Sequence, residues 1–288
     1  MLREGLLILP LFVGKVKSGG KENDMVTARK PVTAIIAVII TVAMVVTLMA
    51  VPANAATKQT IKVKRTNYVL AVGSKYSTKP TAKTKMTFSS DNPSVASVSQ
   101  SGKIVANRKG VTKIRIKAKQ TKKYNGANKT LNVIVVNKYP YSKKTETYTD
   151  KQKKNAKIIY KFLKKKGYTT YEACAIIGNM HWESALDPKA VESNGDGVGL
   201  CMWSYGRKTN LKEYAKSKNK SWKDINVQLE FFAKEMKSYT TLRSNTSKSN
   251  DVEWITDELT NKYFRPGVPC YEKRKAASIH ALKVFWQK

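Results

Sequence analysis

Acidic side chains gather in one short stretch of an otherwise basic sequence. Residues 183–196 contain a single base, Lys189, against four acids, which are Glu183, Asp187, Glu192 and Asp196. Glu183 follows Trp182 near the end of a predicted helix, and burial there would raise the pKa of its carboxyl group. A carboxylic acid that stays protonated near neutral pH can donate a proton to a glycosidic oxygen, often with a second carboxylate as base or nucleophile. The stretch therefore predicts glycoside chemistry, although a lone glutamate beside a tryptophan is more commonly structural.

Cysteine and metal chemistry explain the sequence less well. Its only cysteines and histidines are Cys174, Cys201, Cys270, His181 and His280. No nucleophile motif surrounds the cysteines, so we expect buried small apolar side chains, one pair of which could form a disulfide after export. The acids of 187–196 lack paired-ligand spacing and could hold calcium only weakly, whereas Asn194-Gly195-Asp196-Gly197 is typical of a turn. We expect no metal and no cofactor.

Helices are predicted to position the acidic stretch. A first helix runs from a cap at Asp150 to Lys166, with apolar residues on one face. Thr169 and Glu172 form a capping box for the next helix, 170–184, which bears Glu183. Residues 185–205 predict an irregular loop with a short hairpin. Further helices are predicted over 207–218, 222–238 (with a capping box of Ser221 and Asp224), 251–262 and 271–286.

Residues 56–138 are instead typical of an all-β domain. Turn signals such as Asp91-Asn92-Pro93 and Ser101-Gly102 separate short segments that alternate apolar and polar residues or carry β-branched runs. Short strands at this spacing indicate a sandwich or barrel. The predicted strands are Thr60–Arg65, Tyr68–Val72, Lys85–Phe88, Val95–Val98, Lys103–Val105, Thr112–Ala118 and Leu131–Val136.

Charge separates the chain into the same two halves. The 288 residues carry a net charge of +34, with 54 basic and 20 acidic side chains. Residues 56–145 contain one acid, Asp91, against 21 bases, whereas residues 146–288 contain 16 acids against 27 bases. Apolar residues make up 41% of the sequence, which excludes wholesale disorder. A charge of this size implies a polyanionic partner, either nucleic acid, an acidic membrane or a cell-wall polymer.

The start of the chain favours a partner outside the cell. Arg29 and Lys30 precede an apolar run over 34–51, and Ala53-Asn54-Ala55 follows it, which is the pattern of a secretory signal cleaved after Ala55. The alternative is a retained transmembrane anchor formed by 34–51. We therefore expect a secreted or wall-associated protein that binds no nucleic acid. The predicted organisation is a signal region (1–55), a β domain (56–138), a linker (139–149) and a helical domain (150–288).

The β half resembles the group 2 bacterial Ig-like domains. The run FSSDNPSVASVSQSGKIVANRKGVTKIRIKA (88–118) has their serine-aspartate turn, V-A-S-V strand, G-K-I hairpin and glycine before an alternating strand. The resemblance implies a β-sandwich without catalysis that associates with the surface or wall. Its lysine excess suggests contact with anionic cell-wall polymers, and the alternative is a spacer with a solvated basic face.

The helical half resembles the phage tail lysozyme family of peptidoglycan hydrolases. The matching runs are NAKIIYKFLKKKGYTTYEACAIIGNMHWESALDP (155–188), GVGLCMWSYGRKTNL (197–211) and SWKDINVQLEFF (221–232). The resemblance implies a lysozyme-like fold with Glu183 as the catalytic acid. It places Asn179 and Ser184 along the site, Gly199, Trp203 and Ser204 in a hairpin that closes the cleft, and the segment Tyr263–Gly267 at its rim. Met202 departs from the family, whose members usually have glutamine there.

Together these features predict a multidomain chain, an all-β Ig-like sandwich followed by a mainly α lysozyme-like domain of the α+β class. We expect a monomeric muramidase that cleaves the β-1,4 bond between N-acetylmuramic acid and N-acetylglucosamine in peptidoglycan glycan strands. The alternatives are a lytic transglycosylase that acts on the same bond and a wall-binding protein without activity. The expected substrate-binding residues are Asn179, Ser184, Asp187, Asn194, Asp196, Trp203, Ser204, Arg207, Tyr263 and Phe264.

Overall fold

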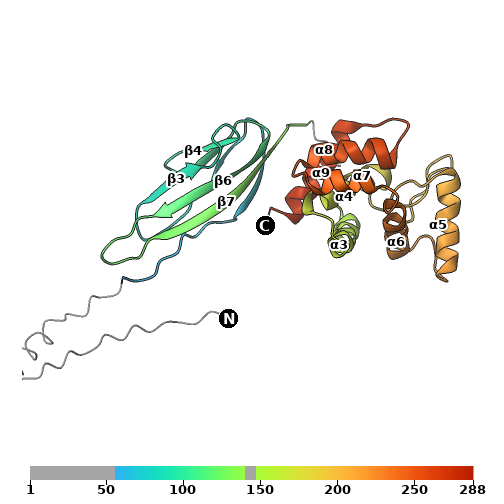
Figure 1. Cartoon of the computed structure of the whole chain (residues 1–288), viewed down its shortest axis with the longest axis horizontal. Coiled ribbons are helices and arrows are strands. Elements are labelled where there is room, and N and C mark those ends of the chain that lie inside the picture. The colour runs from blue at the N-terminus through green and yellow to red at the C-terminus, as the bar shows by residue number, and fades with distance from the viewer. Residues whose placement is uncertain (1–55, 140–146, 288) are drawn as a thin grey trace, which may run out of the picture. The chain divides into compact units, whose positions relative to one another are not determined.

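The computed structural model describes residues 56–139 and 147–287, and residues 56–288 group into one compact unit (Figure 1). The predicted signal region and most of the predicted linker lie outside the described residues. Within 56–139 and 147–287, no helix is long and apolar enough to cross a membrane. The candidate anchor at 34–51 belongs to the part of the chain that is not described.

The N-terminal half is a sandwich of two sheets. The larger sheet has the order β1-β7-β6-β3 and the smaller one β2-β5-β4. Strands β1 and β7 are parallel, and the other neighbours are antiparallel. The strands are β1 (Asn67–Ala71), β2 (Lys75–Ser77), β3 (Met86–Ser90), β4 (Ala96–Val98), β5 (Lys103–Ala106), β6 (Gly110–Ala118) and β7 (Ala127–Val136).

Alternation along β6 builds both faces of the larger sheet. Ile114 and Ile116 are fully buried in the core between the two sheets, whereas the intervening Lys113, Arg115 and Lys117 are exposed. Side chains on a strand point alternately to opposite faces, so one strand supplies both an apolar core and a basic surface. The mixed apolar and basic sequence of 112–118 follows directly from this geometry.

Six of the seven predicted strands are confirmed, and the seventh is wrong. Residues 60–65 form only a single bridge, between Lys62 and Thr81, although Ile61 is buried in the sandwich core. The alternating pattern there reflects which side chains are buried, but the backbone does not pair continuously with another strand. The neighbouring Gln59 side chain contacts the sandwich, because its amide donates to the Asn125 carbonyl at 2.7 Å. The short strand β2, with only three residues, carries too little pattern to be predicted.

The C-terminal half is helical, as predicted. Its central helix is α4, which is buried along most of its length and packs against α3, α8 and α9. The described elements are α3 (Asp150–Lys165), α4 (Thr170–Ser184), α5 (Tyr205–Ser217), α6 (Ile225–Met236), α7 (Thr240–Ser247), α8 (Val252–Leu259), the π-helical turn η1 (Thr260–Phe264) and α9 (Tyr271–Phe285). Helix α7 and the turn η1 are absent from the sequence-based prediction.

Capping side chains set the start of α3, α4, α6 and α8. Thr169 and Glu172 form the predicted capping box of α4. Thr149, not Asp150, caps α3, because its hydroxyl accepts a hydrogen bond from the Gln152 amide. The predicted box of Ser221 and Asp224 is also wrong, since the Asp224 side chain is itself the cap of α6.

Helices α4 and α9 cross closely at one glycine. A Cβ added at Gly178 would lie 2.0 Å from the Ser278 hydroxyl oxygen and 2.5 Å from its amide nitrogen. Only a residue without a side chain allows this approach. The crossing brings Arg274, one turn before Ser278 on α9, to the end of α4 that bears Glu183.

Candidate active site

Glu183 lies in the last turn of α4, where the helix gives way to the acidic loop. Ala185 ends the helix with a left-handed backbone, at φ 53°. The Glu183 side chain is 12% exposed and lines two cavities, of about 720 and 420 Å³. A carboxyl group that is mostly buried but open to a cavity is suited to proton transfer with a bound substrate.

The two cavities meet at Glu183. Glu183 and Met202 line both of them, so a groove passes on either side of the carboxyl group. The larger cavity is also lined by Thr147, Thr149, Gln152, His181, Trp182, Ser184, Ala185, Ala190 and Ala277. The smaller one is also lined by Glu192, Asn194, Asp196, Cys201, Ser204, Tyr205, Phe264, Arg265, Pro266 and Gly267. A chain-like substrate could extend through both, with its cleaved bond at the carboxyl group.

The carboxyl group of Glu183 is held between opposing effects. Burial raises its pKa, the Arg274 guanidinium lowers it, and the negative charge of Glu192 raises it again. The net shift is upward, so burial outweighs the ion pair. Glu183 therefore keeps its proton to a higher pH than an ordinary glutamate, as the sequence analysis expected from burial.

Arg274 is the buried partner of Glu183. Its Nη1 lies 2.8 Å from Glu183 Oε1, and its side chain is 1% exposed. The guanidinium is fixed on other sides, because Nε donates to the Pro269 carbonyl at 2.7 Å and Nη1 donates to Asn179 Oδ1 at 3.1 Å. Asn179 Oδ1 also accepts the Thr260 hydroxyl at 2.9 Å. Residues from α4, η1 and α9 thus share one polar cluster behind the carboxyl group.

Of the three other acids in the stretch, two lie on the groove and one does not. Glu192 and Asp196 line the smaller cavity with Glu183 and are exposed. Glu192 Oε2 accepts the amide of Gly197 at 3.1 Å, which closes the tip of the loop. Asp187 instead pairs with Lys151 at 2.6 Å, and although partial burial raises its pKa, this contact lowers it overall. Asp187 lines neither cavity.

A second carboxylate, which no sequence motif predicts, binds residues that neighbour the lining of the smaller cavity in the chain. Glu235 on α6 accepts hydrogen bonds from Trp203 Nε1 at 2.8 Å, from Arg207 at 2.8 and 2.9 Å, and from the Tyr263 hydroxyl at 2.6 Å. Burial raises its pKa, but these donors lower it overall. Glu235 lies four residues after Phe231 and three after Phe232 on the apolar face of α6, and an acid at such a position needs buried partners.

The predicted site residues therefore divide into two groups. Glu183, Ser184, Asn194, Asp196, Ser204 and Phe264 line the cavities, and their contact with a substrate stays a prediction. Asn179, Trp203 and Tyr263 are fully buried, and Asp187 and Arg207 point to partners within the protein. The structure gives these five a supporting position behind or beside the groove. Ser184 also supports the loop, since its hydroxyl donates to the Leu200 carbonyl at 3.1 Å.

Cysteine chemistry gains no support from the geometry. Cys174, Cys201 and Cys270 are all free, and burial raises the pKa of Cys201, which borders the smaller cavity, well above its ordinary value. A thiol held in this way does not ionise to a nucleophile. Burial also lowers the pKa of His280 to about 4, so this imidazole stays neutral. In the described ranges, no group of three or more His, Cys, Asp or Glu residues could hold a metal ion.

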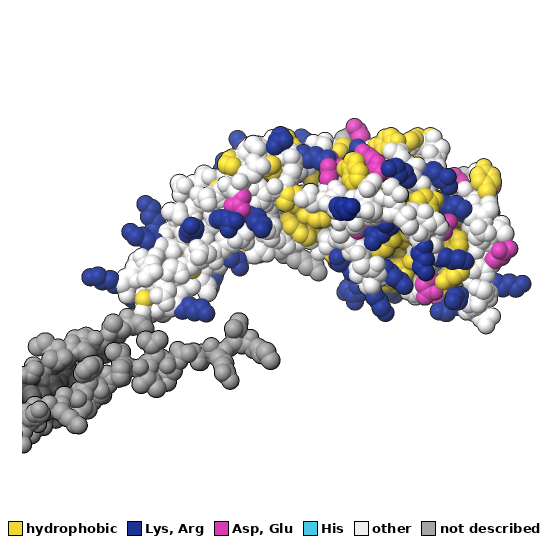
Figure 2. Space-filling model, in the orientation of Figure 1, with side chains coloured by type: hydrophobic (Ala, Val, Ile, Leu, Met, Phe, Trp, Pro, Cys, Tyr) yellow, Lys and Arg dark blue, Asp and Glu magenta, His cyan; other side chains and the backbone are white. Residues whose placement is uncertain are grey.

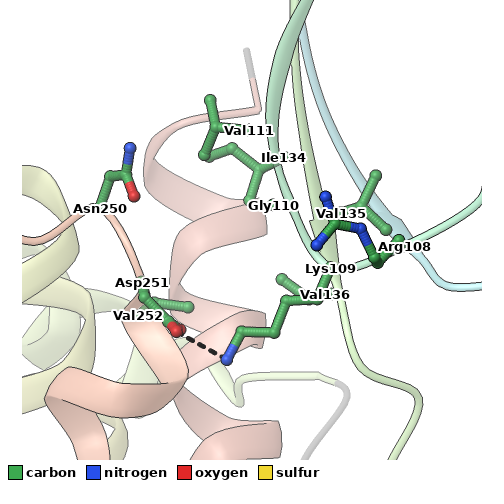
Figure 3. A pocket seen from close by; sticks show the side chains of 10 residues that line it. All are labelled: Arg108, Lys109, Gly110, Val111, Ile134, Val135, Val136, Asn250, Asp251 and Val252. Atoms are coloured by element: carbon green, nitrogen blue, oxygen red, sulfur yellow. Dashed lines mark ion pairs between the residues drawn. The ribbon is translucent and has the colours of Figure 1, made fainter. Parts of the chain in front are cut away.

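Another cavity, of about 440 Å³, lies away from Glu183 between β6, β7 and the start of α8 (Figure 3). Its lining is mostly backbone and aliphatic side chains, and its ammonium group, from Lys109, pairs with Asp251 at 2.7 Å and Glu253 at 3.1 Å. The buried Glu253 also accepts the Asn137 amide at 2.7 Å. These contacts join strand and helix residues and pair the Lys109 ammonium group with two carboxylates.

Family models match both halves of the chain. Residues 154–285 match the phage tail lysozyme model, and residues 45–128 match that of the bacterial Ig-like domain of group 2. The order is the one predicted from the sequence, and it agrees with a sandwich followed by a helical domain. Part of the second match, 45–55, falls outside the described residues. A search of the curated proteins found no match.

Solved structures resemble parts of the chain. Domains 4 and 5 of the S-layer protein SbsC are 26% identical over 26% of this chain and 50% of theirs, at a TM-score of 0.23. A bacterial Ig-like domain-containing GH10 xylanase from termite gut is 17% identical over 31% of this chain and 23% of its own, at a TM-score of 0.23. The chain spans at most half of the first similar structures, 50%, 13% and 45% of their lengths. At TM-scores this low, these likenesses carry no argument about function.

Proposed function

We propose that this chain, whose residues 154–285 match the phage tail lysozyme model, is a secreted muramidase with Glu183 as its general acid. The family supports lysozyme-like hydrolysis of peptidoglycan. The bond we propose is the β-1,4 link between N-acetylmuramic acid and N-acetylglucosamine. The observation that carries the proposal is the position of Glu183, mostly buried at the junction of two cavities, with its pKa raised by burial.

In the proposed reaction, Glu183 donates its proton to the glycosidic oxygen as the bond breaks. An oxocarbenium-like centre develops on the sugar, and water attacks it. The carboxylate left on Glu183 is stabilised by the Arg274 guanidinium, which keeps its charge throughout. Trp182 in the larger cavity and Phe264 in the smaller one offer apolar surface for the sugar rings. Raising the pKa of the acid by burial fits the need for a protonated donor.

Glu192 and Asp196 are the carboxylates placed to assist the water. Both line the smaller cavity with Glu183, whereas Asp187 is held by Lys151 outside the groove. Both are exposed, and the Glu192 carboxylate already accepts the backbone amide of Gly197. We therefore assign them to electrostatic support of the positive centre, with the acetamido group of the substrate as the alternative source of assistance.

A lytic transglycosylase is the second candidate function. Glu183 is mostly buried and its pKa is raised, whereas the other carboxyl groups that line the two cavities, Glu192 and Asp196, are exposed. A single acid suffices for a reaction in which the sugar closes a 1,6-anhydro ring without water.

Product mass tests the proposal and separates the two reactions. Full-length protein incubated with purified peptidoglycan should release muropeptides with a free reducing end, one water heavier than their anhydro forms. Anhydro products would show that the reaction is transglycosylation and not hydrolysis. If no fragment is released from walls of several compositions, the protein is a wall-binding protein without activity.

The Ig-like domain is proposed to hold the enzyme on the wall through anionic polymers. Figure 2 shows Lys and Arg side chains spread over the visible face of the β-sandwich domain, where Asp and Glu side chains are scarce. Lys113 and Lys117 on β6 are exposed and are part of the basic charge of this domain. Export through the signal at 1–55, with cleavage after Ala55, and a monomeric state are part of the same proposal.

A further inference from the structure

Arg274 stands out among the residues behind the groove because it is a buried cation that none of the sequence motifs includes. It lies on α9, 91 positions after Glu183 in the chain, and reaches the carboxyl group through the close crossing of α4 and α9 at Gly178. A guanidinium that is 1% exposed loses most of its hydration, so the structure must supply compensating contacts. Those contacts are Glu183, Asn179 and the Pro269 carbonyl.

We infer that Arg274 is a positioning residue for Glu183, which fixes carboxyl oxygen Oε1, leaves Oε2 to carry the proton, and sets the upper pH limit of the reaction. The inference rests on the proposed function of Glu183 as general acid. It goes beyond that function in two ways. It assigns the transferred proton to one carboxyl oxygen, and it makes a residue on α9 determine the pH above which activity falls.

The two carboxyl oxygens of Glu183 have different surroundings. Oε1 lies 2.8 Å from Arg274 Nη1. The ion pair with Arg274 is made by Oε1. Glu183 lines both cavities, so Oε2 is the oxygen left for a substrate in the groove. A proton on Oε1 would face a permanently charged guanidinium, so the protonated form carries its hydrogen on Oε2.

The cluster around Arg274 is built to hold one geometry. Asn179 Oδ1 accepts from both Arg274 and Thr260, while its amide group donates to the Ala175 carbonyl at 3.1 Å. A rotation that exchanges the oxygen and nitrogen of the Asn179 side chain would therefore lose the hydrogen bonds that Oδ1 accepts from Arg274 and Thr260. The guanidinium cannot move away from Glu183 without giving up its own hydrogen bonds to Asn179 and Pro269, which is costly for a buried cation.

Arg274 also opposes burial in its effect on the acid. Burial raises the pKa of Glu183, and the guanidinium lowers it. The other charged or titratable groups that face the carboxyl group or line its two cavities are few; they are Glu192, Asp196, Cys201, Tyr205, Arg207, Arg265, His181 and, over the Trp182 ring, Lys273. Unlike the other cations, Arg274 forms an ion pair with Glu183. Its removal should therefore raise the pKa of Glu183 more than removal of any of them.

The experiment measures kcat/KM against pH on soluble, uncross-linked peptidoglycan fragments for full-length wild type, Arg274→Met, Arg274→Lys and Lys273→Met. In wild type, kcat/KM should fall at high pH as Glu183 loses its proton, and we call this fall the upper pH limb. Arg274→Met should move this limb by about one unit to higher pH, because Glu183 then keeps its proton to a higher pH. Its maximal rate should fall about tenfold or more. Lys273→Met removes one charge from the same helix and should leave the limb in place.

Arg274→Lys keeps the charge but offers a single ammonium where the guanidinium serves three acceptors. Its limb should stay near that of wild type while kcat falls about tenfold with KM little changed. A limb unmoved in folded Arg274→Met would overturn the inference. If that variant does not fold, full kcat in Arg274→Lys would overturn it equally. An active Glu183→Gln would instead refute the proposed function, and this outcome is distinct from both.

Discussion

At the scale of single residues, Glu183 shows how burial and an ion pair compete for one proton. The guanidinium of Arg274 at 2.8 Å would by itself give a carboxylate of low pKa, yet burial raises the pKa of Glu183 overall. A folded-state pKa above the unfolded value means that the native state binds its proton more tightly. Its contribution to stability is therefore complete at low pH and is lost as pH rises through the folded pKa.

The first prediction compares the thermal stability of wild type and Glu183→Gln across pH. Below the ordinary glutamate value of 4.5 both proteins carry a neutral group at position 183. From there upward, wild type should lose stability relative to the amide variant, and the gap in Tm should level off above the folded pKa. Calorimetry at half-unit intervals measures this. A gap that changes in the opposite direction would mean that the ion pair wins over burial.

The second prediction concerns the remaining acids of the loop. Glu192→Gln should move the upper pH limb to lower pH, because the charge of Glu192 raises the pKa of Glu183. Asp196→Asn should lower the rate moderately, whereas Asp187→Asn should leave it unchanged, since Asp187 pairs with an exposed Lys151. Initial rates and Tm values of the three variants test this. One variant that loses more than about a thousandfold in rate at unchanged Tm would identify a second catalytic carboxylate.

The sequence predicts Glu183 as the acid but does not predict the residues that hold it. Glu183 could be predicted because its neighbours form a recognisable motif. Arg274 could not, because its role depends on a crossing of helices far apart in the chain. Trp203 and Tyr263 were expected to contact the substrate, but both donate to Glu235 inside the protein. An aromatic residue in a motif can mark the wall of a site as readily as its surface.

At the scale of elements, the helix pair α4 and α9 determines whether the site forms. Local signals predicted α4 exactly, because its capping box and its length are encoded within its own residues. Helix α7 and the turn η1 were missed, since eight and five residues with mixed composition carry little periodicity. What a single sequence cannot supply is the distance between two helices, which depends on residues such as Gly178.

The third prediction tests that crossing. Gly178→Ala places a methyl group 2.0 Å from the Ser278 hydroxyl oxygen, so the helices must separate or fail to pack. We expect a loss of about 1–3 kcal/mol in the free energy of unfolding, with lowered activity. Gly206→Ala on α5 is the matched control, because no atom lies within 4 Å of its added Cβ. Urea titration of both variants measures the difference, and equal midpoints would contradict the account of the crossing.

At the scale of the whole molecule, the two domains differ in charge. The Ig-like half carries almost no acids, and its sandwich alternates a core with an exposed basic face along β6. The order and class of the domains could be predicted from composition and motifs. The burial of Ile134 and Val136 could not, because their side of β7 packs into the core formed by the helical residues. Removal of the whole Ig-like domain would strip these contacts, so charge variants of the full chain are the cleaner test.

The fourth prediction uses such variants. Lys113→Gln with Lys117→Gln should weaken retention on purified walls at low salt and leave turnover of soluble fragments unchanged. The effect should fade as salt rises, because exposed charges are screened beyond about 10 Å at 0.1 M. Lys212→Gln with Lys216→Gln, on the exposed face of α5, is the control of equal charge. Equal retention of both double variants would mean that the Ig-like domain is a spacer.

The central claim, that Glu183 is the catalytic acid, is tested most directly by the rate at which Glu183→Gln releases fragments from peptidoglycan. The amide keeps the size of the side chain but has no acidic proton to donate. Loss of general acid catalysis should lower the rate about 10²–10⁴-fold, with a Tm no lower than that of wild type above pH 4.5. A folded variant that keeps more than about a tenth of the wild-type rate would contradict the claim, since it falls outside that range.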